Sequence, residues 1–213
     1  MTRSIVLGLA LSLASLACAE AKCTDPAGLM VDWQGCIKSN ANLAGANLRV
    51  ARLTGAKLAG ANLAGADLAN AVLTDADLTG ANLAGANLER ADLAGAKLAG
   101  ANLSGAKLDF TNLPGDNLTR TKLADSELYL TRLEGADLSG LDLTKVVFMS
   151  TWVAGANLSG ADLSDAVFDN ANLSGANLAG AKLAGAYTDG ANLSGATWTD
   201  GKICAPGSVE VCK

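Results

Sequence analysis

The sequence contains no histidine, and this absence removes much of the common catalytic and metal-binding chemistry. A standard Ser-His-Asp or Cys-His triad needs an imidazole as its base. Zinc sites draw on histidine or on paired cysteines in CxxC motifs, and neither is present. The phosphate-binding motif G-x-G-x-x-G does not occur either. We therefore expect no catalytic residues, no metal and no cofactor, and a protein that is not an enzyme.

The chain also lacks an excess of basic residues and, beyond its N-terminus, a long hydrophobic run. Its 16 Lys and Arg against 21 Asp and Glu give a formal net charge of −5, with both signs mixed along the chain. Such a mildly acidic surface does not suit nucleic acid. The mean hydropathy is +0.26, but apolar residues recur singly rather than in a run of about 18 or more. We expect neither nucleic-acid binding nor stable membrane insertion.

The N-terminus has the pattern of a secretory signal peptide. Arg3 precedes an apolar segment, Ile5 to Leu16, and small residues follow at two cleavage positions, after Ala19 or after Ala21. The apolar segment is too short for a permanent membrane span. A lipoprotein anchored at Cys18 is the alternative, but Ser15 stands where such signals prefer a bulky aliphatic residue. We expect a periplasmic or secreted protein.

A five-residue repeat fills most of the chain. From Leu43 to Ile203 it runs without insertion or deletion, and Leu occupies 27 of the 33 central positions. Two residues before the centre is the alanine position, Ala in 24 of 33 repeats. One residue before the centre is the asparagine position, Asn or Asp in 18 of 33, and two residues after it is the glycine position. The motif reads A-(N/D)-L-x-G.

A period of five excludes a helix and a flat strand. On a helix, five residues advance by about 500°, and in a strand successive Leu side chains would fall on opposite faces. Only a chain that turns once per repeat keeps every Leu inside. The glycine position is occupied by another residue every 20 residues, at Val50, Asn70, Arg90, Phe110, Leu130, Ser150 and Asn170. Four repeats therefore form one coil.

These features predict an all-β solenoid whose coils are squares of four short extended sides. Coils stack through backbone hydrogen bonds at about 4.8 Å per layer, so about eight coils form a rod of roughly 40 Å. Leu and Ala point inward. Gly, Asn and Asp are expected at the corners because they tolerate positive φ.

The repeats resemble the pentapeptide repeat family, and this resemblance implies a right-handed quadrilateral β-helix. The flanking segments, Val31 to Cys36 and Ala196 to Cys212, are similar to those of secreted members. Trp33 fits a central position, whereas Lys38 breaks the rule at the next one. The expected organisation is a signal peptide (1–19), an N-terminal cap with a first irregular coil (20–40), the β-helix (41–203) and a C-terminal cap (204–213).

Four cysteines remain once Cys18 is removed with the signal peptide, and an exported protein favours disulfides between them. Of the three connectivities, Cys23 with Cys36 and Cys204 with Cys212 are favoured, because a rod of roughly 40 Å separates the two clusters. Each disulfide would hold a cap on a terminal coil, where the stack otherwise exposes unpaired backbone N–H and carbonyl groups.

The repeat departs from its consensus mainly between Asp109 and Trp152, where small polar residues replace Ala. One interpretation is that they fit the position and bond locally to the backbone. The other is a widened or bent coil that presents a recognition surface. Asp116 needs a partner if its carboxylate points inward, and Arg120 and Lys122 lie near in sequence.

Pairs of carboxylates occur in the repeats, at Asp75 with Asp77 and at Asp137 with Asp142. Because Asp is the repeat's own residue at the asparagine position, we assign these pairs to turns and not to catalysis.

Apolar residues collect on one side of the rod in consecutive coils. This candidate interaction face consists of Phe110, Tyr129, Leu130, Val147, Met149, Trp152, Val167 and Tyr187. Aligned apolar residues rich in aromatics and Met are typical of interfaces. The alternative is that these side chains only shield the stacked backbone.

Three classes of function remain. The preferred one is an exported, non-catalytic scaffold that binds an unidentified protein or a second copy of itself, for example as a homodimer. The resemblance also implies an acidic, DNA-mimicking inhibitor of gyrase, but export and mixed charges argue against it. A carbohydrate-active solenoid enzyme would need carboxylates and an arginine in a groove.

Overall fold

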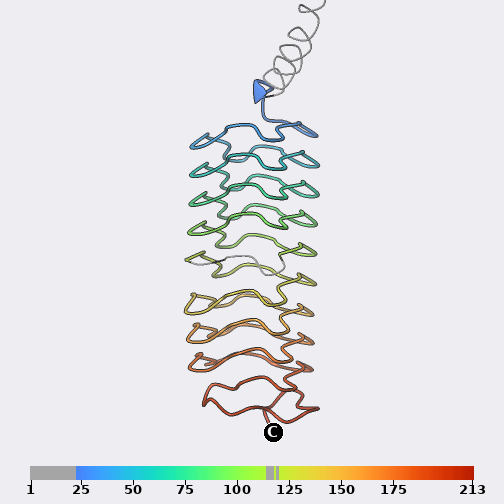
Figure 1. Ribbon diagram of the computed structural model, residues 1–213, viewed down its shortest axis with the longest axis vertical. Coiled ribbons are helices and arrows are strands. Elements are labelled where there is room, and N and C mark those ends of the chain that lie inside the picture. The colour runs from blue at the N-terminus through green and yellow to red at the C-terminus, as the bar shows by residue number, and fades with distance from the viewer. Residues whose placement is uncertain (1–22, 114–117, 119) are drawn as a thin grey trace, which may run out of the picture.

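The computed structural model describes residues 23–113, 118 and 120–213. They form a rod of stacked coils that runs from the N-terminal part of the chain at one end to the C-terminus at the other (Figure 1). The predicted signal peptide, the alternative lipoprotein site at Cys18, and Asp116 lie outside the described residues.

Each coil contains 20 residues, because parallel β-bridges join residues 20 apart, from Asp32 with Arg52 to Asn177 with Thr197. Each side contributes one bridging residue followed by a two-residue turn. Among the described residues, these parallel sides are no longer than a single bridge. The fold is a right-handed quadrilateral β-helix of about eight coils, as the five-residue period and the resemblance predicted.

The interior is filled by the central and alanine positions. Leu93 and its neighbours above and below in the same column, Leu73 and Leu113, are at most 2% exposed. Phe148 and Phe168 take two central positions in adjacent coils, and their rings stack at 4.7 Å with an angle of 2° between planes. The predicted inward orientation of Leu and Ala is confirmed in the coils between the ends.

Gly, Asn and Asp take positive φ at the corners as expected, for example Asn70 with φ 58° and Asp75 with φ 57°, but they do so at the glycine position and not at the asparagine position. In the described regular coils, the left-handed residue of each repeat is the one at the glycine position, as at Gly65 with φ 64° and Val50 with φ 57°. It is the third residue of a β-turn closed by the alanine N–H, for example Ala66 N–H to the Leu63 carbonyl at 3.0 Å.

The asparagine position instead bonds with its side chain. Asn62 Oδ1 accepts the N–H of Ala64 at 3.3 Å, and Asn62 Nδ2 donates to Asn42 Oδ1 in the preceding coil at 3.2 Å. Asn82 and Asn102 extend the same ladder at 3.2 Å. Asn and Asp are therefore preferred because a short acceptor side chain closes the turn onto the backbone two residues later.

The N-terminal end is covered by a cap that joins the β-helix earlier than residue 41. Trp33 is 1% exposed in a central position, and its Nε1 donates to the Asp25 carbonyl at 3.2 Å. Lys38 departs from the consensus without breaking the coil, since its Nζ lies 3.9 Å from the centre of the Trp33 ring. A disulfide joins Cys23 to Cys36, with Cα atoms 5.4 Å apart.

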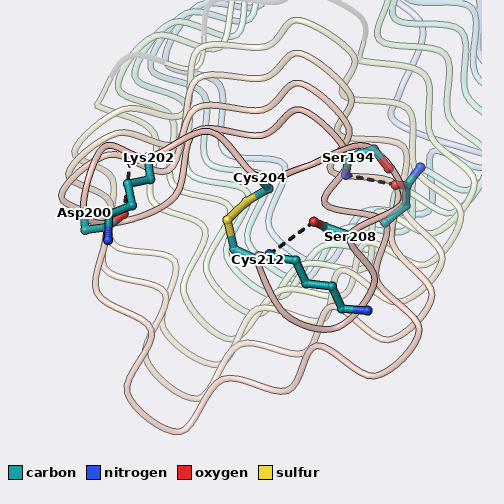
Figure 2. Close-up of a disulfide and its surroundings, with 8 residues drawn as sticks. Ser194, Asp200, Lys202, Cys204, Ser208 and Cys212 are labelled. Atoms are coloured by element: carbon teal, nitrogen blue, oxygen red, sulfur yellow. Dashed lines mark hydrogen bonds and ion pairs between the residues drawn. A yellow bond between two sulfur atoms is a disulfide. The ribbon is translucent and has the colours of Figure 1, made fainter.

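The C-terminal cap folds back across the last coil (Figure 2). A disulfide joins Cys204 to Cys212, and the Cys204 N–H donates to the Ala196 carbonyl at 2.8 Å. The five-residue sequence motif continues to Ile203. The Ile203 side chain is nevertheless 73% exposed, and Ile203 forms an antiparallel bridge with Thr197. Gly201 reverses the chain after Trp198, with φ 83°, so the regular coil ends before the expected boundary at 203.

The bridges between this cap and the last coil reach two of its four sides, and Glu210 also bonds to Thr188 and Gly190 on a third. The antiparallel bridges of the cap reach Asn192 and Thr197, which belong to those two sides. On the other two sides Leu183, Ala186 and Thr188 are half-buried at positions that are buried in the coils above.

Candidate interaction face

The structure brings the residues of the candidate interaction face together on one side of the rod and its corner. Val147, Val167 and Tyr187 follow one another in a column of parallel bridges. Tyr129 and Met149 form the column two residues along the chain, and Phe110 and Leu130 the corner column next to it. Trp152 begins the adjacent side.

Most large side chains of this face are open to solvent. Their exposed fractions are 41% for Phe110, 37% for Tyr129, 37% for Met149, 47% for Trp152 and 61% for Tyr187. Leu130, Val147 and Val167 are half-buried. In the described chain between Leu43 and Thr199, Val50 and Val72 are the exposed large apolar residues outside this face. The exposed apolar surface of the regular coils is therefore concentrated here.

Aromatic contacts link neighbouring coils within the face. The rings of Phe110 and Tyr129 meet edge to face, with centroids 5.5 Å apart. The Arg90 guanidinium lies 5.1 Å from the centre of the Phe110 ring. Phe110 and Leu130 both occupy the glycine position with φ of 59° and 52°. A left-handed conformation costs a non-glycine residue roughly 1 to 2 kcal/mol, so these side chains stay against a backbone preference.

Trp152 is paired in the same way at the corner. Arg132 lies 5.3 Å from the centre of its ring and 3.5 Å from Glu134 Oε1. Sequence reasoning missed both arginines, although each stands 20 residues before its aromatic partner. The coil spacing that identified the fold also contains this signal.

Carboxylates border the apolar residues on the same side of the rod. Asp109 and Glu127 lie on one flank, and Asp169 and Asp189 on the other; we call these four the flanking carboxylates. Among the described residues no ion pair joins them to a Lys or Arg. Asp169 Oδ1 is buried without a hydrogen-bond partner.

The Asp109 carboxyl shows the electrostatic consequence. Burial raises the pKa of Asp109, and the charges of Glu127 and Glu89 raise it further. The Tyr129 N–H, which donates to Asp109 Oδ1 at 2.9 Å, and Lys107 act in the opposite direction. The net rise in the pKa of Asp109 is therefore due first to burial, and the two neighbouring acids add to it.

The non-consensus stretch is explained in part by local bonding. The buried hydroxyls of Thr111 and Thr131 both donate to the Leu108 carbonyl at 2.6 Å. The parallel ladder is nevertheless interrupted, because no bridge joins Lys122 to Asp142 in the described chain. Leu141 occupies an alanine position beside this gap and is 7% exposed.

The paired carboxylates of the repeats serve turns. Asp77 Oδ1 accepts the N–H of Thr79, and Asp137 Oδ1 accepts that of Ser139. Hydrogen bonds from these two residues hold the pKa of each carboxyl below its usual range. The Ser164 hydroxyl, with Lys182, lowers the pKa of Asp162 to about 2. Such groups stay ionised at neutral pH.

No three His, Cys, Asp or Glu side chains among the described residues lie close enough together to hold a metal ion. No helix within the same part of the chain is long and apolar enough to cross a bilayer.

The repeat and the coil geometry agree with a known family model. The model for pentapeptide repeats matches the chain in 8 copies, across residues 39–148 and 154–195. The chain belongs to the pentapeptide repeat family. The family resemblance inferred from the A-(N/D)-L-x-G motif is thereby confirmed.

Solved pentapeptide repeat structures are similar to this chain. HetL, involved in heterocyst differentiation regulation in the cyanobacterium Nostoc sp. strain PCC 7120, is 33% identical over 89% of this chain and 98% of its own, with a TM-score of 0.48. A trypsin-treated form of QnrB1, a plasmid-mediated fluoroquinolone resistance protein, is 18% identical over 72% of this chain and 84% of its own, with a TM-score of 0.64.

A third structure, a pentapeptide repeat protein from the Arabidopsis thaliana thylakoid lumen, is 30% identical over 53% of this chain and 68% of its own, with a TM-score of 0.38. A comparison with curated proteins found no match to the chain. The likeness to QnrB1 agrees with the fold, and the family rests on the match to the pentapeptide repeat model.

Proposed function

We propose that this pentapeptide repeat protein is an exported, non-catalytic scaffold that binds a protein partner, or a second copy of itself, through the candidate interaction face. One observation carries the proposal. The exposed large apolar side chains of the regular coils gather on one side, in successive coils, while Val50 and Val72 stand apart. Contiguous exposed apolar surface that contains aromatics and Met is typical of protein interfaces.

Backbone conformation gives further support. The coil needs only a residue with positive φ at the glycine position, and Gly supplies it without strain. Phe110 and Leu130 take that conformation with bulky side chains. Residues held in unfavourable backbone conformations often belong to functional sites, where the side chain itself is required.

Export is supported by the cysteines and the N-terminus. The two disulfides staple opposite ends of the rod, and such bonds persist in oxidising compartments. The apolar segment from Ile5 to Leu16 has the pattern of a secretory signal. Fractionation of cells that express a C-terminally tagged chain tests this part: a reduced, cytoplasmic protein would contradict it.

The interaction is tested with Tyr129→Glu combined with Met149→Glu. Each replacement puts a charge into the centre of the face but leaves the interior unchanged. We expect light scattering across a range of concentrations, and partner capture from cell-envelope extract, to show association by the wild type and its loss in the double variant.

The matched control places the same charges two sides further along each coil, at Ser139→Glu and Ser159→Glu. These residues occupy the equivalent position, ten residues after Tyr129 and Met149. We expect this control to associate like the wild type and both variants to keep the wild-type circular dichroism spectrum. Equal association of all three proteins would eliminate this face as the binding site.

A further inference from the structure

If the candidate interaction face binds a partner, as proposed above, the charges around its apolar residues indicate the chemistry of that partner. The apolar side chains form a diagonal band across five coils. It begins at Phe110, passes Tyr129 and Met149, and ends at Val167 and Tyr187. Asp109 and Glu127 lie above the diagonal on one flank, whereas Asp169 and Asp189 lie below it on the other.

The charges on this side are unbalanced. In the same five coils it bears one cation, Lys107, against the four flanking carboxylates. The two arginines at its border are already engaged: Arg90 lies 3.7 Å from Glu89, and Arg132 lies 3.5 Å from Glu134. Within the described chain, the flanking carboxylates therefore form no ion pair, and the charge of Lys107 acts on Asp109 from the same flank.

Two local observations concern individual carboxylates of this side, which has fewer cations than carboxylates. Burial and the neighbouring acids raise the pKa of Asp109, so its charged form is disfavoured in the free protein. Asp169 has one buried carboxylate oxygen that no donor reaches. A cation brought close by a partner would stabilise both carboxylates by its charge, without contact to the buried Asp169 oxygen.

We propose that the occupant of this face is a basic amphipathic helix of a partner protein, with an apolar stripe bordered on both sides by Lys or Arg. The apolar stripe covers the diagonal band, and the two basic borders reach the two pairs of flanking carboxylates. Five coils span four spacings of about 4.8 Å, or roughly 19 Å. A helix covers that length in about 13 residues.

The probe is a fluorescein-labelled 16-residue peptide with Leu at helical spacings of three and four and Lys on both borders of the Leu stripe. A second peptide replaces every Lys by Glu, and a third has the same composition with the Leu spacing permuted. Binding is measured by fluorescence anisotropy on the oxidised protein. We expect the first peptide to bind at least about tenfold more tightly than either control peptide.

The charges are tested with a face-neutral variant, Asp109→Asn, Glu127→Gln, Asp169→Asn and Asp189→Asn. Its control neutralises four carboxylates on the other sides: Asp77→Asn, Asp92→Asn, Asp137→Asn and Asp142→Asn. In the control, each Asn keeps the acceptor oxygen of its turn. We expect the face-neutral variant to lose about tenfold in affinity for the Lys peptide and the control less than twofold, because screening limits distant charges.

The apolar contribution is tested with Tyr129→Ser and Met149→Ser, which leave the charge unchanged and should also weaken the Lys peptide. Equal binding of the three peptides, or equal losses in the face-neutral variant and its control, would overturn the proposed occupant. If the glutamate variants of Tyr129 and Met149 abolish association while the face-neutral variant keeps it, the face binds a partner but this occupant is wrong. If neither set changes association, both proposals fail.

Discussion

Replacing Leu93 by Asn tests the assignment of inside and outside on which the whole rod depends. Leu93 is fully buried, and the column above and below it contains Leu73 and Leu113, both also buried. Truncating a buried Leu to Ala costs about 2.7 to 5 kcal/mol. An Asn fills part of that space but buries an amide without partners, which adds about 1 to 3 kcal/mol. We expect Leu93→Asn to cost about 4 to 6 kcal/mol.

Urea denaturation followed by circular dichroism measures this loss. With an m-value of about 2 kcal/mol/M, the midpoint should fall by about 2 to 3 M. The control is Ala94→Ser, at the neighbouring residue in the turn, which should stay within about 0.5 kcal/mol of the wild type. Leu183→Asn is a second control, because Leu183 is half-buried at the open end of the rod and should lose less than Leu93. Equal midpoints for Leu93→Asn and Ala94→Ser would refute the inward assignment of Leu.

Three further predictions follow from the caps, the face and the turns. Mature, oxidised protein, from which Cys18 has been removed with the signal peptide, should contain no free thiol, and peptide mapping should link the cysteines within each cap; a link between the two ends would contradict the structure. Asp109→Asn should stabilise the protein at neutral pH, because a carboxyl whose folded pKa is raised favours folding below its unfolded pKa and loses that contribution as pH rises through the folded value. The gain should vanish on acidification, and a gain independent of pH in melts from pH 3 to 8 would exclude this cause. Gly95→Ala should destabilise more than Gly85→Ala, although both have positive φ, because its Cβ would lie 2.5 Å from Asp75 Oδ1 and that of Gly85 would meet nothing within 4 Å. Adding Asp75→Ala to Gly95→Ala should remove this extra loss of stability, and equal melting temperatures of the two single variants would refute the clash.

The regular coils were predictable because one physical requirement repeats in every five residues. A buried Leu at the centre and a small residue two positions earlier fix which side chains point inward. Phe148 and Phe168 lie 20 residues apart at central positions, which is one coil, and their rings stack in the structure. Periodicity therefore determined the fold, the coil length and the residues of the interior.

The role of Asn and Asp was harder to infer from sequence. Both residues tolerate positive φ, so their abundance beside Gly suggested a shared corner role. The structure separates the two tasks, since Asn62 bonds to the N–H of Ala64 and to the side chain of Asn42. The second bond joins residues 20 apart, and only the coil spacing brings such residues together.

The ends of the rod could not be placed from the pattern alone. Lys38 looks like an error in the repeat, yet its side chain covers Trp33, which a terminal coil would otherwise expose. Ile203 looks like a regular centre, yet the chain has already reversed at Gly201. At an end of the rod there is no further coil to bury the central side chain. The five-residue sequence motif therefore no longer predicts which residues are buried there.

The residues of the interaction face differ from those of the interior, because the fold hardly constrains which side chain occupies an outward position. Asn, Ser, Ala, Lys and Glu all occupy outward positions in neighbouring coils with the same backbone ladder, so packing does not explain a bulky apolar residue there. At Phe110 and Leu130 the backbone even disfavours it, with φ of 59° and 52° where Gly would be unstrained. An outward residue that neither stabilises the coil nor fits its turn is best explained by what it contacts outside the chain. That reasoning applies most strongly to the diagonal band, where such residues adjoin one another in successive coils, and less to Val50, which takes the same kind of turn beside the exposed Met30 at the N-terminal end.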